Sequence, residues 1–254
     1  MLSCAVVGIG AHMLTLADPE RRELVLKIPR DDRYFDHYWR QRLAYLSSRL
    51  AKRRAATSRP WPMSVALALR DVLFNRDGRD RRQHFARVLD ALSIGVTDET
   101  ARRFLAASHI EACVSIGSIG GRRVRYVGRC IVQERAARFI GPEDLSSDDL
   151  EVFRRSNASA LHSALWTLGV GLAATRETWG PVNWGITQDG RLALFDFSSL
   201  TTTRSYVERA IAPESSAATE AYYAGLVGTE PARVHFAVVR DQIRLDRLSS
   251  AWPP

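Results

Sequence analysis

The stretch from Asn183 to Leu200 constrains the fold of this 254-residue chain more than any other. Asp189-Gly190 is a strong signal for a two-residue hairpin turn, and apolar residues flank it on both sides. We therefore predict two short strands that begin after Asn183 and end before Asp196. An amide oxygen and a carboxylate, 13 positions apart in the sequence, would then meet at one site. Both are hard oxygen ligands of the kind that Mg²⁺ takes.

A second interpretation of this stretch is an ordinary surface hairpin with a capping asparagine, so the rest of the chain has to decide. Apolar residues make up 46% and charged residues 25% of the chain, as in ordinary globular proteins. The length suffices for one large domain or two small lobes. No apolar run reaches the roughly 18 residues of a membrane span. The N-terminus lacks a charged signal region, and three cysteines without metal-like spacing fit a reducing cytosol, so we expect a cytoplasmic protein.

The net charge of +8 is carried by 34 arginines and only 2 lysines. The basic residues are scattered, with short clusters at 52–54 and 122–125. No aromatic residues interleave with them to form a base-stacking platform. We therefore expect no nucleic-acid partner, while an acidic partner remains open.

Residues 4–28 predict three short strands. Gly8-Ile9-Gly10 ends the first strand and Lys27 lies on the third. A dinucleotide-binding fold would need a helix directly after the glycines, whereas a second strand follows here. Lys27 could be a strand lysine that extends to solvent. We prefer a phosphate-binding role, because its neighbours are apolar and the chain otherwise almost always uses arginine.

Residues 32–108 show helical spacing of apolar residues throughout, with breaks at Pro60-Trp-Pro and at Gly95. Residues 112–136 predict a hairpin that turns at Gly120-Gly121. A long helix should then open at Ser146 and end at Gly169. Two further helices are expected over Pro213–Leu226 and Pro231–Leu248.

This order of elements resembles the protein-kinase superfamily. The segment Val25-Leu26-Lys27-Ile28 is similar to the kinase strand whose lysine holds the α- and β-phosphates of ATP. Gln133-Glu134 is similar to the end of the strand that leads into the hinge between the two kinase lobes. Asn183 stands at the place of the catalytic-loop asparagine, and Asp196-Phe197-Ser198 at that of the DFG motif. The resemblance covers residues 4–28 and 112–200.

The resemblance implies an α+β, two-lobed kinase-like fold with a small antiparallel N-lobe sheet and a truncated helical C-lobe. The N-lobe would span residues 1–136, including a helical insertion at about 32–108, and the C-lobe 137–254. ATP and Mg²⁺ would be the cofactors. The implied nucleotide-binding residues are Gly8, Gly10, Lys27, Gln133, Glu134 and Ala136, and the implied metal ligands are Asn183 and Asp196.

The chain departs from the kinase pattern at three places. The third glycine of the phosphate loop is missing, with Met13 near its place. Thr178 stands where the catalytic aspartate would be and cannot accept a proton, so Glu177 is the candidate catalytic carboxylate. No single acid is marked as the partner of Lys27; the candidates are Asp36, Asp71, Asp90 and Glu99.

Two functions therefore remain open at this point. The first is an atypical phosphotransferase with an unknown acceptor. The second is an inactive pseudokinase that serves as a nucleotide-dependent binding module and engages a protein partner through its helical insertion. We expect no membrane association for either.

Overall fold

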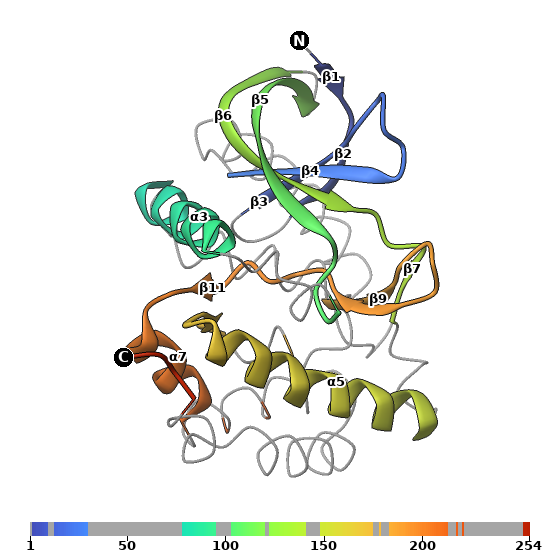
Figure 1. Ribbon diagram of the computed structural model, residues 1–254. Helices are drawn as coiled ribbons and strands as arrows, with labels where there is room; N and C mark the ends of the chain where they lie inside the picture. Colours follow the sequence, from blue (N-terminus) through green and yellow to red (C-terminus); the bar gives the residue numbers. More distant parts are fainter. Residues whose placement is uncertain are drawn as a thin grey trace, which may run out of the picture. The chain divides into compact units, whose positions relative to one another are not determined.

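The computed structural model describes residues 2–9, 13–29, 78–94, 103–119, 122–140, 148–174, 178, 183–212, 217, 220 and 251–254. Within them the chain forms an α+β arrangement, as the sequence predicted (Figure 1). The helices are α3 (Gly78–Ser93), α5 (Asp148–Thr167) and α7 (Arg204–Ile211). The strands are β1 (Leu2–Cys4), β2 (Val6–Ile9), β3 (Met13–Ala17), β4 (Leu24–Pro29), β5 (Ser108–Ile119), β6 (Arg122–Glu134), β7 (Arg138–Phe139), β8 (Gly171–Leu172), β9 (Trp184–Ile186), β10 (Leu192–Leu194) and β11 (Leu200–Thr201).

Six strands form one sheet in the order β1-β5-β6-β4-β3-β2. β2, β3 and β4 pair antiparallel, as predicted, whereas β1 runs parallel to β5. Leu14 and Leu16 on β3, and Leu26 and Ile28 on β4, are buried. Because side chains alternate between the two faces of a strand, these leucine and isoleucine positions define the core face of the sheet.

The turn between β3 and β4 is fixed by Asp18, which is almost fully buried. Its carboxylate accepts the backbone N–H groups of Glu20 and Arg21 at 2.9 and 3.0 Å, and the Arg21 side chain at 2.8 Å. Arg21 also makes a two-pronged contact with Glu111 on β5, at 2.9 and 3.1 Å. Burial by itself would raise the pKa of Asp18, but these donors together lower it.

A second set of strands forms the sheets β10-β9-β7 and β11-β8. The fully buried Trp166 and Trp184 lie at the centre of this region, and α5 ends before Gly169, which has φ +68° as predicted for a helix-ending glycine. Gly171 on β8 lies tight against α7, because a Cβ at Gly171 would come within 2.7 Å of Val207. No helix among the described residues is long and apolar enough to cross a membrane.

The chain forms two compact units, and it passes between them three times. Unit 1 comprises Met1–Phe85 and Glu111–Cys130, and unit 2 comprises Ala86–Ile110 and Ile131–Pro254. The three boundaries fall inside α3, β5 and β6, so each of these elements contributes residues to both units.

The prediction of helices throughout residues 32–108 is only partly right. α3 is present, with Phe85, Val88, Leu89 and Leu92 buried at helical spacing. The prediction of a helix was wrong for residues 104–108, at the C-terminal end of this range. Phe104 accepts the N–H of Leu194 at 2.9 Å, Ala106 donates to Leu194 at 3.0 Å, and β5 begins at Ser108. Pairing with β10 supplies backbone partners that override the local helical pattern.

Several predicted elements lie outside the described residues. They are the helices over 32–74, the turn at Gly120-Gly121, the helix start at Ser146 and the helix over 231–248. Of the helix over 213–226 only Ala217 and Glu220 are described, and both are helical. In contrast, α7 is present although the sequence analysis did not predict it.

Candidate functional site

The hairpin predicted around Asp189-Gly190 is present. β9 and β10 pair antiparallel, with Ile186 opposite Leu192. Gly190 has φ +85°, a backbone conformation that glycine adopts without steric cost. Thr187 closes the turn, since its hydroxyl accepts the Arg191 N–H at 2.9 Å and donates to the Asp189 carboxylate. That hydrogen bond lowers the pKa of Asp189.

The open end of the hairpin brings the backbone at Asn183 and at Asp196 together, whereas the meeting of their side chains at a metal site stays a prediction. The backbone N–H of Phe195 donates to the Asn183 carbonyl at 2.8 Å, and that of Asp196 approaches the same oxygen at 3.4 Å. The Asp196 side chain is exposed, and its Oδ1 accepts the Ser198 N–H at 3.3 Å. The backbone of Asn183 and that of Asp196 therefore lie next to each other.

Asn183 and Asp196 are the residues of this hairpin that could take part in binding Mg²⁺. Mg²⁺ usually keeps several waters and takes one or two protein oxygens, with phosphate oxygens completing its coordination. Within the described part of the chain, no group of three His, Cys, Asp or Glu side chains could hold a metal alone. Asn183 and Asp196 could thus hold a Mg²⁺ that a nucleotide phosphate shares.

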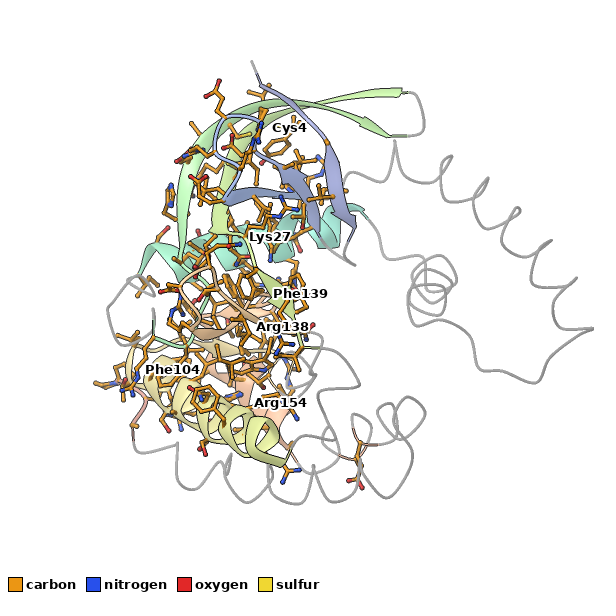
Figure 2. All side chains as sticks on the ribbon, turned by 90° about the vertical axis from the view of Figure 1, so that its right-hand side faces the viewer. Cys4, Lys27, Phe104, Arg138, Phe139 and Arg154 are labelled. Atoms are coloured by element: carbon orange, nitrogen blue, oxygen red, sulfur yellow. The ribbon has the colours of Figure 1, made fainter. Side chains whose placement is uncertain are left out.

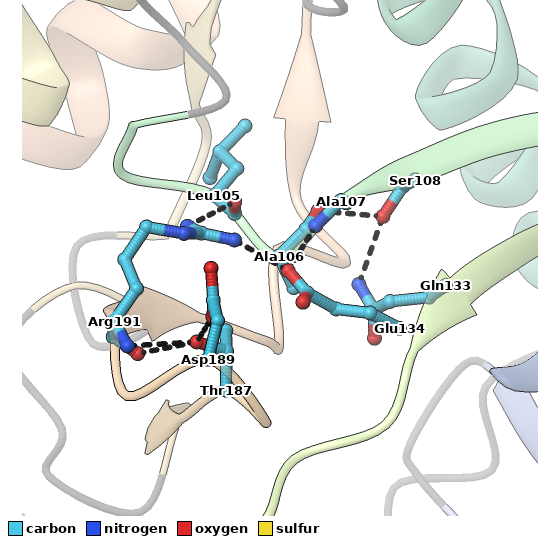
Figure 3. A network of polar contacts seen from close by, with 9 residues as sticks. All are labelled: Leu105, Ala106, Ala107, Ser108, Gln133, Glu134, Thr187, Asp189 and Arg191. Atoms are coloured by element: carbon cyan, nitrogen blue, oxygen red, sulfur yellow. Dashed lines mark hydrogen bonds and ion pairs between the residues drawn. The ribbon is translucent and has the colours of Figure 1, made fainter. Parts of the chain in front are cut away.

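An ion pair fastens the turn of this hairpin to the end of β6 (Figure 3). The Arg191 guanidinium donates to Glu134 Oε1 at 2.6 Å and to the Leu105 carbonyl at 3.0 Å. The same carboxylate oxygen accepts the Ala107 N–H at 2.5 Å, and the Glu134 N–H donates to the Ala107 carbonyl at 2.9 Å. The Glu134 side chain and N–H are therefore engaged within the protein.

Gln133, expected at the gatekeeper position, is also engaged. Its side chain is almost fully buried, and its amide donates to Ser108 Oγ at 3.2 Å. Ser108 Oγ in turn donates to the Ala106 carbonyl at 2.8 Å. Gln133 thus joins β6 to the start of β5, and contact with a nucleotide is not needed to explain its burial.

Backbone hydrogen bonds hold the segment after Glu134 against β9. The Ala137 N–H donates to the Ile186 carbonyl at 2.8 Å, and the Ile140 N–H to the Trp184 carbonyl at 2.9 Å. Between them β7 pairs antiparallel with β9. Ala136, the expected adenine-contacting position, lies just before these bonds and is half-buried. Unit 2 contains Ala136 as well as Asn183 and Asp196.

Unit 1 contains the expected phosphate-binding residues. Gly8 on β2 lies opposite Thr15 on β3, and Thr15 lies opposite Lys27 on β4 (labelled in Figure 2). Directly opposite residues share one face of a sheet, so these three form a row across the strands. A Cβ at Gly8 would lie 3.3 Å from the Thr15 Cβ, so glycine allows the close approach. Gly10 lies outside the described residues.

Thr178, at the position of the catalytic aspartate, faces the protein interior. It is fully buried, and its Oγ1 lies 3.0 Å from Nε2 of His162 on α5. The indole N–H of Trp184 donates to the Thr178 carbonyl at 2.7 Å. Burial lowers the pKa of His162 to about 4, so its imidazole is neutral at pH 7. These contacts make Thr178 a structural residue.

The remaining candidates of the sequence analysis gain no role from the structure. Glu177 lies outside the described residues, as do Asp36, Asp71 and Glu99. Asp90 is exposed on α3.

The part that Arg191 plays has no signal in the local sequence. Its partner Glu134 lies 57 positions away, so no local spacing rule connects the two. His162 is buried on α5, with Thr178 as its partner. The only sequence signal for that contact was a histidine among the apolar positions of a long helix.

The comparisons with known proteins show no family. No family model matches the chain, and no curated protein matches it. Among solved structures, similarity is found to the complex of Rv3197 with erythromycin from Mycobacterium tuberculosis, with 15% identity over 77% of this chain and a TM-score of 0.36. It is also found to WbdD, with 13% identity over 93% of this chain and a TM-score of 0.36. The chain spans 45% of the length of each protein. TM-scores this low support no conclusion about function.

Proposed function

We propose that this chain binds ATP with Mg²⁺ and is an atypical phosphotransferase of kinase-like fold. The supporting observation is the open end of the hairpin, where the backbone N–H groups of Phe195 and Asp196 both approach the Asn183 carbonyl. In our proposal the Asn183 side-chain amide and the exposed Asp196 carboxylate supply the two oxygens that a nucleotide-bound Mg²⁺ takes from the protein. A capping asparagine in an ordinary hairpin would not need an exposed carboxylate at its side.

In this proposal each residue has a defined task. Asp196 and Asn183 supply the two protein oxygens of the metal site, and Lys27 supplies a compact ammonium group for the phosphates, with Gly8 in the same row of strands. A bound Mg²⁺ would neutralise the charge that develops on the phosphates during transfer. The backbone around Glu134 and Ala136 would meet the base. Glu177 would orient the acceptor.

Two variants of one hairpin test the nucleotide claim. Asp196→Asn removes the charge of the proposed metal ligand, and Asp189→Asn removes another exposed charge, at the turn of the same hairpin. Ligand at 100 times its Kd stabilises a protein by about 2.7 kcal/mol, which corresponds to roughly 5–10 °C in a chain of this size. We expect ATP with Mg²⁺ to raise the Tm of the wild type and of Asp189→Asn by this amount.

Asp196→Asn should lose the part of the shift that depends on Mg²⁺. A folded wild-type protein whose Tm does not respond to millimolar ATP and Mg²⁺ would refute nucleotide binding. An equal loss of the Mg²⁺-dependent Tm shift in both variants would show that ATP binding depends on the total charge of the hairpin and not on a metal ligand at position 196.

A pseudokinase that binds nucleotide without turnover is the second candidate, and the burial of Thr178 favours it. The base position contacts His162 and carries no proton acceptor. Glu177→Gln separates the two candidates, because a positioned general base contributes about 10²–10⁴-fold in rate. An enzyme that uses Glu177 should lose at least about tenfold in kcat with its ATP affinity retained. ATP binding without turnover towards any acceptor, in the wild type, would establish the pseudokinase.

A further inference from the structure

One aromatic side chain on the strand that pairs with the β9–β10 hairpin is left open to solvent. Phe139 on β7 is 56% exposed, although the strand that carries it is hydrogen-bonded along β9. Phe139 lies opposite Gly185 on β9, and Gly185 lies opposite Ala193 on β10. Opposite residues share a face, so this row offers one large ring next to two positions with almost no side chain.

The space above Gly185 is filled by Phe195. A Cβ at Gly185 would come within 3.1 Å of the Phe195 ring and within 2.9 Å of the Arg138 carbonyl, so only glycine fits there. Phe139 packs against Phe195 edge to face, with ring centroids 5.5 Å apart and an interplanar angle of 70°. Phe195 is buried. The exposed ring of Phe139 is therefore supported from within by a fixed partner.

The position of this aromatic pair along the chain relates it to the proposed nucleotide site. Phe195 directly precedes Asp196, so their Cα atoms lie about 3.8 Å apart. The Phe195 N–H is the group that binds the Asn183 carbonyl. Phe139 follows Ala136, the expected base-contacting position, by three residues. All of these residues belong to unit 2, so the arrangement does not depend on unit 1.

We propose that Phe139 is the platform on which the base of the bound nucleotide stacks, which makes it a specificity-determining residue; this inference rests on the proposed function. A single exposed ring is too small for a protein-docking patch, which needs a contiguous apolar area of several hundred Å². A planar base matches a single ring, because aromatic stacking uses one face and tolerates any base. Phe139 would thus distinguish nucleotides from phosphate compounds that lack a base.

The test compares two ligands that share phosphates and differ in the base. Binding of ATP with Mg²⁺ and of inorganic tripolyphosphate with Mg²⁺ is measured by titration calorimetry on the full chain. Stacking on an aromatic side chain typically changes affinity by about 5- to 150-fold. Phe139→Ala should therefore weaken ATP binding by at least about fivefold and leave tripolyphosphate binding unchanged.

Two further variants isolate the ring. Phe139→Tyr keeps the aromatic face and should bind ATP as the wild type does, whereas Phe139→Leu keeps apolar bulk and should bind as poorly as Phe139→Ala. If Phe139→Ala does not fold, Phe139→Leu gives the same comparison. Phe153→Ala removes another exposed phenylalanine, on α5, and should change neither ligand.

The outcomes separate this inference from the function on which it rests. Unchanged ATP affinity in Phe139→Ala, with binding still lost in Asp196→Asn, would overturn the stacking role and keep the nucleotide site. Equal weakening of ATP and tripolyphosphate would also overturn it, since the ring would then support the phosphate site and not the base. A wild type that binds neither ligand would refute the proposed function itself.

Discussion

His162 is a neutral imidazole enclosed by the protein, and this single residue makes stability depend on pH. Its pKa is about 4 in the folded chain, against about 6.5 in an unfolded one. Between these values the unfolded state binds the proton more readily, so stability falls as the pH falls from 6.5 to 4. The full effect is about 3 kcal/mol at most, since one pKa unit corresponds to about 1.4 kcal/mol.

His162→Gln tests this at the residue scale. Glutamine offers an amide near the place of Nε2 and does not titrate, so the variant should lose most of the Tm decrease between pH 6.5 and 4. Asp18 has a lowered pKa and acts in the same direction, but only as the pH falls through its own lower range. Chemical unfolding at several pH values measures both effects. An unchanged slope in His162→Gln would mean that the imidazole is already charged at pH 6.

At the scale of elements, the Arg191–Glu134 pair connects the hairpin to the end of β6. The two side chains are 27% and 21% exposed, and Arg191 also binds the Leu105 carbonyl. We expect a double-mutant cycle with Arg191→Met and Glu134→Gln to give a coupling free energy of about 1 kcal/mol or more. The pair Arg204–Glu208 on α7 is more exposed, at 40% and 33%, and provides the matched cycle. Its coupling should be about 0.3–0.5 kcal/mol. Equal couplings would show that the hairpin is not held by this pair.

The elements also show which parts of the fold can be predicted from sequence. The hairpin was predictable because its turn, its strands and the meeting of Asn183 with Asp196 all depend on neighbours in the sequence. The strand-like pairing of 104–106 was not, because its partner Leu194 lies far along the chain. Thr178 was placed by counting from Asn183, and counting says nothing about the direction of a side chain. The exposed ring of Phe139 lies against Gly185 and Phe195, and the alternation of residues along one strand does not predict contacts with residues so far along the chain.

For the whole molecule, the chain contains separate probes of its two units. The three cysteines are buried in unit 1. Burial and the neighbouring Cys113 raise the pKa of Cys130 to about 12, and burial raises that of Cys4. Such thiols react only after the protein opens. Trp166 and Trp184 are buried in unit 2.

We expect both units to unfold in one transition, because α3, β5 and β6 each contribute to both. Urea unfolding is followed by alkylation of the thiols and by tryptophan fluorescence, with Trp39 and Trp61 replaced by phenylalanine so that the emission reports on unit 2. The two midpoints should coincide. Midpoints that differ by more than the error of the fits would show that the units unfold independently.

The three passages of the chain between the units also set an order of events on the ribosome. Unit 1 has all its residues once Cys130 is made, but residues 104–106 must wait for Leu194, 88 positions after Ala106. At about 5–20 residues per second this delay lasts roughly 4–18 s, during which that backbone lacks its partner. The same path means that no single cut of the chain releases either unit whole: any truncation that ends unit 1 at residue 130 also retains residues 86–110, without the strand that pairs with them.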